Sequence, residues 1–228
     1  MKRMLKIMGG LIVFVAVLIV AFYYANNEDL PTGKQGAEAD ALAHKMLKAI
    51  HNEAYKTTRF IEWSFREKHF YKWDKKKNIV EVTWDNNKVI LHTKHPEKSE
   101  VFIDEKQTFR VELIDKAILY FKNDRFWLIA PHTVFDKNVE RRLVQHNNKN
   151  ALLVTYKTEN NTLGDSYLWI LDDNNIPIRY KMWVSISPTN GMDATWEDWI
   201  TTNSGTKLPK NHKLKKNEIN MGNVKAYN

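Results

Sequence analysis

One serine stands in a context that could support nucleophilic catalysis, Gly164-Asp165-Ser166. A catalytic serine of this kind leaves a strand, enters a helix and needs a base to activate its hydroxyl. Here the next residues, Tyr167–Leu171, continue as an apolar strand pattern, and no Asp-x-x-His follows later in the chain. We therefore interpret Ser166 as part of a turn before a strand.

Acidic residues surround two tryptophans near the C-terminal end, which is a composition found in sugar-cleaving sites. These residues are Asp193, Glu197 and Asp198, beside Trp196 and Trp199. Successive side chains of a strand point to opposite faces, so Glu197 and Asp198 cannot act on one bond. We expect them to be surface carboxylates.

Histidines and cysteines do not form a metal-binding pattern in this sequence. His44 and His51 lie seven residues apart on an expected helix, too far to share an ion, and His92 and His95 have no third ligand nearby. The absence of cysteine excludes thiolate sites and disulfides. We expect no metal, no other cofactor and no enzymatic activity.

Basic residues give the chain a formal net charge of +8, but three of them precede the first carboxylate. The clusters Lys75–Lys77 and Lys213, Lys215 and Lys216 fall on an expected hairpin tip and a terminal segment. At such positions charged residues normally keep the edges of a sheet soluble. The functional alternative is that these two clusters contact anionic lipid head groups. We expect no nucleic-acid partner.

Tryptophan is the strongest positive signal, because eight residues of this type all fall in expected strands. They are Trp63, Trp73, Trp84, Trp127, Trp169, Trp183, Trp196 and Trp199. In a closed sandwich these rings fill a core, whereas in a sheet that bends around one helix some of them line an apolar cavity.

The N-terminal segment combines a basic start with a long apolar stretch. The stretch from Ile7 to Asn27 contains no charged residue. As a helix with a rise of ~1.5 Å per residue, it is long enough to cross a bilayer core of ~30 Å. We expect residues 1–27 to be a retained transmembrane anchor or a signal cleaved after Ala25. In both cases the basic start places the rest of the chain outside the cytoplasm, on the periplasmic side of the inner membrane.

Two helical segments are expected in the remaining chain. Residues 28–40 contain proline and glycine and predict a linker, and the apolar residues from Glu38 to about Thr57 recur at helical spacing. Thr108–Lys122 predicts a short second helix. It is followed by an apolar strand, Arg125–Ala130, and a loop from Pro131 to Arg142.

Short segments of alternating polarity, separated by Asn- and Asp-rich turns, predict an antiparallel meander. The expected strands are Phe60–Phe65, His69–Trp73, Ile79–Trp84, Lys88–His92, Glu100–Ile103, Arg142–Gln145, Leu152–Lys157, Tyr167–Leu171, Ile178–Ile186, Ala194–Thr201 and Lys207–Leu214. The folded domain is expected over residues 41–216, with a C-terminal tail over 217–228.

The order of a basic apolar start, a linker, one amphipathic helix and a long antiparallel meander resembles the LolA/LolB-like superfamily, the periplasmic carriers of outer-membrane lipoproteins. Several segments within about residues 38–214 also resemble uncharacterised extracytoplasmic proteins of that fold. They are Asn123–Pro131 with Phe135-Asp136, Tyr167–Ile170 with Ile176–Arg179, and Gly205–Pro209. The resemblance implies an α+β fold in which a strongly curved antiparallel sheet, a half-open barrel, carries helices on its concave side and receives acyl chains there.

Strand parity and this resemblance together predict a ligand-binding surface. The residues expected on the concave side are Ile61, Trp63, Phe65, Val80, Val82, Trp84, Tyr180, Met182, Val184 and Ile186, and those expected in a lid are Phe126, Leu128 and Val134. We expect a domain that binds a lipid or the acyl chains of a lipoprotein. The alternative is a membrane-tethered sensor or scaffold that binds a protein partner.

Overall fold

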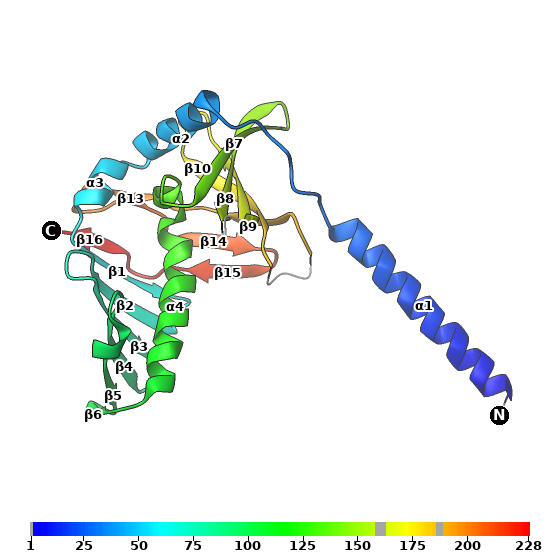
Figure 1. The fold of residues 1–228 in the computed structure, drawn as a ribbon, viewed down its shortest axis with the longest axis horizontal. Helices are drawn as coiled ribbons and strands as arrows, with labels where there is room; N and C mark the ends of the chain where they lie inside the picture. Colours follow the sequence, from blue (N-terminus) through cyan, green and yellow to red (C-terminus); the bar gives the residue numbers. More distant parts are fainter. Residues whose placement is uncertain (1, 158–162, 186–188) are drawn as a thin grey trace.

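The computed structural model describes residues 2–157, 163–185 and 189–228 as an α+β fold dominated by antiparallel sheets (Figure 1). Ile186 lies outside the described residues. Two seven-stranded sheets are present, with a long helix between them and a small two-stranded sheet beside them. All strand pairings within these sheets are antiparallel, as the alternating sequence pattern predicted.

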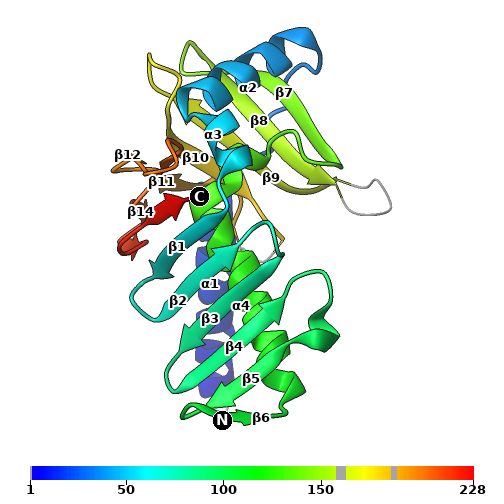
Figure 2. The ribbon, with the colours of Figure 1, turned by 90° about the vertical axis from the view of Figure 1, so that its left-hand side faces the viewer.

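Sheet 1 is a meander of strands from the first half of the chain, with one strand from the C-terminus added at its edge (Figure 2). In spatial order its strands are β16 (Lys225–Tyr227), β1 (Phe60–Phe65), β2 (His69–Asp74), β3 (Ile79–Trp84), β4 (Asn87–His92), β5 (Glu100–Ile103) and β6 (Lys106–Thr108). The strands β1, β3 and β5 have the bounds that alternation predicted.

Sheet 2 contains the second half of the chain. In spatial order its strands are β15 (Asn217–Asn220), β14 (Asn211–Leu214), β11 (Met192–Thr195), β10 (Pro177–Trp183), β9 (Leu163–Leu171), β8 (Lys149–Lys157) and β7 (Val139–His146). The segments expected as Ala194–Thr201 and Lys207–Leu214 are each divided, because β12 (Ile200–Thr201) and β13 (Lys207–Leu208) pair separately.

The chain end links the two sheets, so residues 217–228 are not the tail that the sequence suggested. The backbone N–H of Ser64 donates to the carbonyl of Met221 at 3.1 Å, and that of Arg66 donates to Asn220 at 2.8 Å. Gly222 allows this approach: its φ is 65°, and a Cβ there would lie 2.1 Å from the Ser64 Oγ. The expected single curved sheet is therefore two sheets bonded side to side.

The helices are α1 (Lys2–Asn26), α2 (Ala37–Ala49), α3 (Asn52–Thr57) and α4 (Val111–Ile129), with short 3₁₀ turns η1 (Pro96–Lys98) and η2 (Ala130–Thr133). The expected helix up to Thr57 is broken at His51, which adopts a left-handed φ of 56°. Helix α4 includes most of the segment Arg125–Ala130 that we expected to be a strand. A short apolar segment fits a buried helix end as well as a buried strand, and here it enters the core.

Helix α1 projects away from the sheets (Figure 1) and carries exposed apolar side chains such as Leu11, Phe14 and Ile19. Among the described residues, no helix reaches both the length and the hydropathy of a membrane span.

The segment expected to be a linker, residues 28–40, packs on the outer face of sheet 2. The indole N–H of Trp183 donates to the Glu28 carbonyl at 2.8 Å, and Lys181 forms an ion pair with the Glu28 carboxylate at 2.6 Å. Leu30 packs against a small apolar cluster on that face. Helix α2 then begins at Ala37. Only a few residues of the expected linker therefore lie between the segment packed on sheet 2 and this helix.

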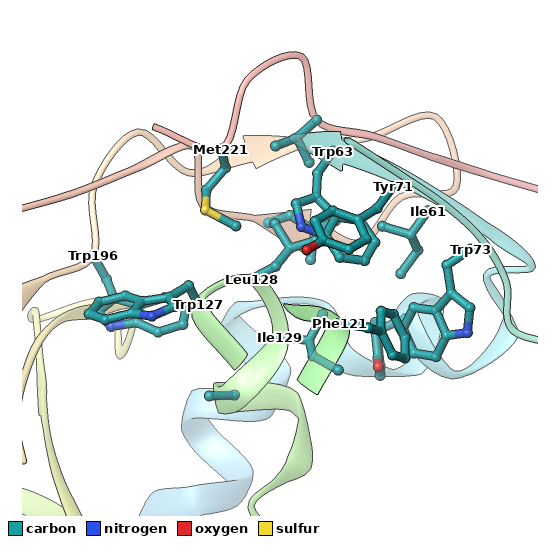
Figure 3. Packing of buried hydrophobic residues seen from close by; sticks show 14 of the residues in the cluster. Ile61, Trp63, Tyr71, Trp73, Phe121, Trp127, Leu128, Ile129, Trp196 and Met221 are labelled. Atoms are coloured by element: carbon teal, nitrogen blue, oxygen red, sulfur yellow. The ribbon is translucent and has the colours of Figure 1, made fainter. Parts of the chain in front are cut away.

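The main core lies between the inner faces of both sheets and α4 (Figure 3). Phe121 of α4 contacts Trp73 of sheet 1 edge-on at 5.4 Å between ring centroids, and Trp127 contacts Tyr180 of sheet 2 at 5.8 Å. Burial of such large rings contributes to the hydrophobic stabilisation, together with the aliphatic side chains of the same cluster. Helix α4 therefore fills much of the space between the sheets.

Candidate functional site

Two adjoining hollows lie between α4 and the inner face of sheet 2, and we refer to them together as the α4 cleft. Their volumes are about 310 and 380 Å³, at the lower end of the range of small-molecule pockets. Both hollows are lined by Lys122, Phe126, Asp165 and Tyr167. The α4 cleft is therefore one continuous surface with two ends.

One end of the α4 cleft is apolar. It is formed by Leu119 of α4 together with Tyr180 and Met182 of β10 and the following Val184. Leu119 is 65% exposed, whereas the other three are at most 7% exposed, so a rigid wall on the sheet faces an accessible apolar side chain on the helix. This arrangement can hold a hydrocarbon group.

The other end of the α4 cleft is polar. Arg125 and Asp136 line it, and the hydroxyl groups of Thr133 and Tyr156 lie 2.9 Å apart at its base. Burial raises the pKa of the Tyr156 phenol to about 12, and burial also raises the pKa of Asp136. This end is thus suited to a polar or charged group.

Of the residues predicted from the sequence to bind a ligand, Phe126, Tyr180, Met182 and Val184 line the α4 cleft. Their role in binding stays a prediction. Phe65 is half-buried at the end of β1 and packs against the core.

The remaining predicted residues are buried in the packed core, and their role in binding likewise stays a prediction. Each of them is at most 3% exposed: Ile61, Trp63, Val80, Val82, Trp84, Leu128 and Val134. Strand parity correctly placed those of β1 and β3 on the inner face, as their burial patterns show. Helix α4 is longer than expected and packs against this face.

The sequence reasoning missed Leu119, Lys122, Arg125, Tyr156 and Tyr167. A helix continued from Val111 to Ile129 would have placed Leu119, Lys122 and Phe126 on one stripe, at spacings of three and four residues. The prediction of a strand from Arg125 onward removed this signal.

A buried carboxylate holds the other side of α4 on sheet 1. The Tyr71 hydroxyl donates to Asp124 at 2.6 Å, and the side-chain amide of Asn123 donates to the same carboxylate at 2.9 Å. Burial, together with the negative charge of Asp124, raises the pKa of the Tyr71 phenol well above its usual range. These contacts position α4, and with it one wall of the α4 cleft.

A separate hollow of about 790 Å³ lies next to α2, α3 and η2. It is lined by His44 and His51, and also by Tyr55 and His132, whose rings stack at 4.3 Å. Burial lowers the pKa of His132 to about 3, so this imidazole is neutral near pH 7. One of its nitrogens faces the Asn52 side chain at 2.9 Å and the other the Lys207 carbonyl at 3.1 Å, so the ring is held in place.

The residues considered for catalysis from the sequence have other partners. The Ser166 Oγ is buried and lies 2.8 Å from the Thr155 hydroxyl, inside sheet 2. Glu197 forms an ion pair with Lys213 at 2.9 Å. The described part of the chain contains no group of three or more potential metal ligands.

Comparisons with known proteins identify two structures of similar fold. No protein-family model and no curated protein matches the sequence. A crystal structure of a DUF1329 family protein from Desulfovibrio piger is 6% identical, with 82% of this chain and 92% of that chain covered and a TM-score of 0.42. A putative outer membrane lipoprotein-sorting protein domain from Vibrio parahaemolyticus is 9% identical, with 81% and 93% covered and a TM-score of 0.35.

Proposed function

We propose that the α4 cleft binds the hydrocarbon part of a lipid or of a lipidated protein and that the domain catalyses no reaction on it. The observation that carries this proposal is the apolar end of the cleft, where Leu119 faces Tyr180, Met182 and Val184. A role in lipoprotein trafficking is what the sequence resemblance implies. As part of the same proposal, the two linked sheets together form the half-open barrel that the sequence resemblance implies.

The size of the cleft sets the scale of the expected affinity. Burial of an acyl chain contributes about 0.8 kcal/mol per methylene group. A segment of about eight methylenes would therefore contribute several kcal/mol after the cost of ordering the chain and the side chains. Because the core residues of sheet 1 are already packed against α4, we expect one short chain to be bound and not several.

The experiment compares two exposed apolar residues of the same helix. Leu119→Asp places a carboxylate in the apolar end of the α4 cleft, whereas Val111→Asp, at the start of α4, changes a residue that is 51% exposed and does not line it. We expect Leu119→Asp to weaken binding of a fluorescent fatty-acid probe at least about tenfold, the effect of some 1.4 kcal/mol. Equal binding by both variants, or no binding by the unaltered protein, would refute the proposal.

The location of the domain is a further part of the proposal, and it rests on the sequence. The uncharged stretch from Ile7 to Asn27, after Lys2, Arg3 and Lys6, would hold the domain at the periplasmic side of an inner membrane or direct its export. Mass spectrometry of the intact protein from its native cells tests this, because it reports the mature N-terminus and any lipid that copurifies. A protein recovered with its N-terminus intact from the cytosolic fraction would contradict it.

A second candidate is a sensor or scaffold that binds a protein partner. The packed space between the sheets favours it, because α4 and the aromatic side chains already occupy most of the concave interior. Crosslinking of the native membrane fraction distinguishes the two functions. A specific protein partner with retained binding after Leu119→Asp would favour the scaffold.

A further inference from the structure

Arg125 has an unusual environment for an arginine that is partly buried. Its guanidinium lies 5.1 Å from the ring centroid of Phe121 and 5.6 Å from that of Trp73, which hold it in place from the core side. Within the described ranges it makes no hydrogen bond and no ion pair. Such donor groups are normally paired, and the planar guanidinium matches carboxylate and phosphate groups well.

Tyr55, which lines the adjoining hollow beside α2 and α3, carries a second donor without a partner. Its side chain is 9% exposed, and none of the described residues receives a hydrogen bond from its hydroxyl. The ring is held by the Lys75 ammonium, 3.6 Å from its centroid, and by the stacked His132 ring. Burial raises the pKa of the Tyr55 phenol, and the positive charge of Arg125 lowers it again.

Asp136 connects these two groups, because it lines both the polar end of the α4 cleft and the hollow beside Tyr55. The positive charge of Arg125 acts on its carboxyl, although the two form no ion pair. Lys122 and Lys137 add two further cations to the lining, likewise with no ion pair in the part of the chain that the structure describes. Positive groups therefore outnumber carboxylates at the polar end, where Asp165 is the second acid.

The two ends of the α4 cleft thus differ in the chemistry they offer. Leu119, Met182 and Val184 line one end, and Arg125 and Asp136 line the other. Tyr55 lines the adjoining hollow, which shares Asp136 with the polar end. Phe126 and Tyr167 line the region between them, so an elongated molecule can contact both ends. A ligand that is charged at one end and apolar along the rest fits this arrangement.

We propose that Arg125 and the Tyr55 hydroxyl bind the anionic head group, a carboxylate or a phosphate, of an amphiphile whose hydrocarbon chain lies at the apolar end of the α4 cleft. This inference rests on the proposed function and adds the class of ligand and its orientation. A neutral lipid or a cationic amphiphile of the same chain length would bind less tightly.

The experiment uses the full chain and four probes: dodecanoate, dodecanol, dodecylammonium and inorganic phosphate. Each is tested for displacement of a fluorescent fatty-acid probe at concentrations below micelle formation. We expect dodecanoate to bind at least about tenfold more tightly than dodecanol, because only the carboxylate forms charge-assisted hydrogen bonds with a guanidinium. We expect no displacement by inorganic phosphate, which lacks the chain.

Three variants identify the residues involved. Arg125→Gln is expected to remove the preference for dodecanoate over dodecanol, and Tyr55→Phe, which deletes only the unpaired hydroxyl, to reduce it. Arg110→Gln is the matched control, because it removes the same charge from an exposed residue just before α4. It should keep the full preference.

The outcomes separate this inference from the proposed function. If dodecanol and dodecanoate bind equally well, the head-group site is refuted while the proposed function stands. If neither binds, the proposed function itself fails. If inorganic phosphate alone displaces the probe, the site binds a free anion, and the proposal of an amphiphilic ligand is refuted. If both Arg125→Gln and Tyr55→Phe keep the full preference for dodecanoate, these two residues do not bind the head group.

Discussion

Asp124 on α4 accepts a hydrogen bond of 2.6 Å from the Nδ1 of His69 on β2, and the two side chains are only 2% and 18% exposed. The His69 ring also stacks on Tyr120, one turn earlier in the helix, at 3.8 Å between centroids. Helix α4 is therefore fixed to sheet 1 by a buried polar contact, while its opposite side forms a wall of the α4 cleft. The width of the cleft depends on this attachment.

Replacement of the buried carboxylate by an amide should be strongly destabilising. In Asp124→Asn the new NH₂ group faces donors from His69, Tyr71 or Asn123, so at least one buried donor loses its acceptor. We expect a loss of about 2–4 kcal/mol in the free energy of unfolding, measured with urea. The control is Asp115→Asn on an exposed position of the same helix, expected to change stability by less than about 0.5 kcal/mol. Equal effects of both variants would show that the buried contact contributes nothing.

The C-terminal part of α4 should contribute to the core as a buried helix. Leu128 is 0% exposed, so Leu128→Ala is expected to cost about 2–5 kcal/mol in urea unfolding. Leu119→Ala removes the same atoms from a residue that is 65% exposed, and we expect a change below about 0.5 kcal/mol. A small effect at Leu128 would contradict the position of the helix between the sheets.

Sequence patterns predicted sheet 1 well because its strands are local. Ile79–Trp84 alternates regularly between inward and outward side chains, and turns of Asn and Asp stand at both ends. From β1 to β6 each strand pairs with its neighbour in the chain, so no long-range information is needed for these six strands. The same alternation correctly placed Val80 and Val82 on the inner face.

The position of α4 could not be predicted in this way. The segment Phe126–Ile129 is apolar throughout, and only its packing between two sheets decides that it is helical. The role of Asn217–Tyr227 was missed for a similar reason, because its short, partly basic strands gain stability from pairing with distant parts of the chain. Both errors concern contacts between residues far apart in the sequence, and the location of the α4 cleft depends on the first of them.

Removal of the last strands should unfold the domain. A chain that ends at Lys216 loses β15 and β16 and with them the buried side chains of Ile219, Met221 and Val224. It also exposes the edge of β1, which pairs with β16. We expect no cooperative thermal transition in circular dichroism.

The matched deletion is at the other end of the chain. Removal of residues 2–26 takes away α1, which projects from the sheets (Figure 1), and should leave the melting temperature of the domain unchanged within about 2 °C. A stable domain without β15 and β16 would show that the chain end does not join the two sheets.

Stability should decrease on mild acidification because two histidines are buried in the neutral form. Burial lowers the pKa of His132 to about 3 and that of His212 to about 4, from an ordinary value of 6.5. Below pH 6.5 the unfolded chain therefore binds protons that the folded protein does not, and the free energy of unfolding falls with falling pH. Each histidine contributes a slope of up to about 1.4 kcal/mol per pH unit, between pH 6.5 and its own lowered pKa.

Urea unfolding between pH 7 and pH 5 measures this decrease in stability. Carboxylates whose pKa is lowered in the folded protein, such as Glu140, lose their contribution to stability mainly below that range. His132→Gln should lower the stability at pH 7, because the stacking on Tyr55 is lost, but it should also reduce the pH slope by about 1.4 kcal/mol per unit. His95→Gln changes an exposed histidine beside Glu97 and serves as the control with an unaltered slope. If His132→Gln and His95→Gln retain the same slope, burial does not hold the His132 imidazole neutral in the folded protein.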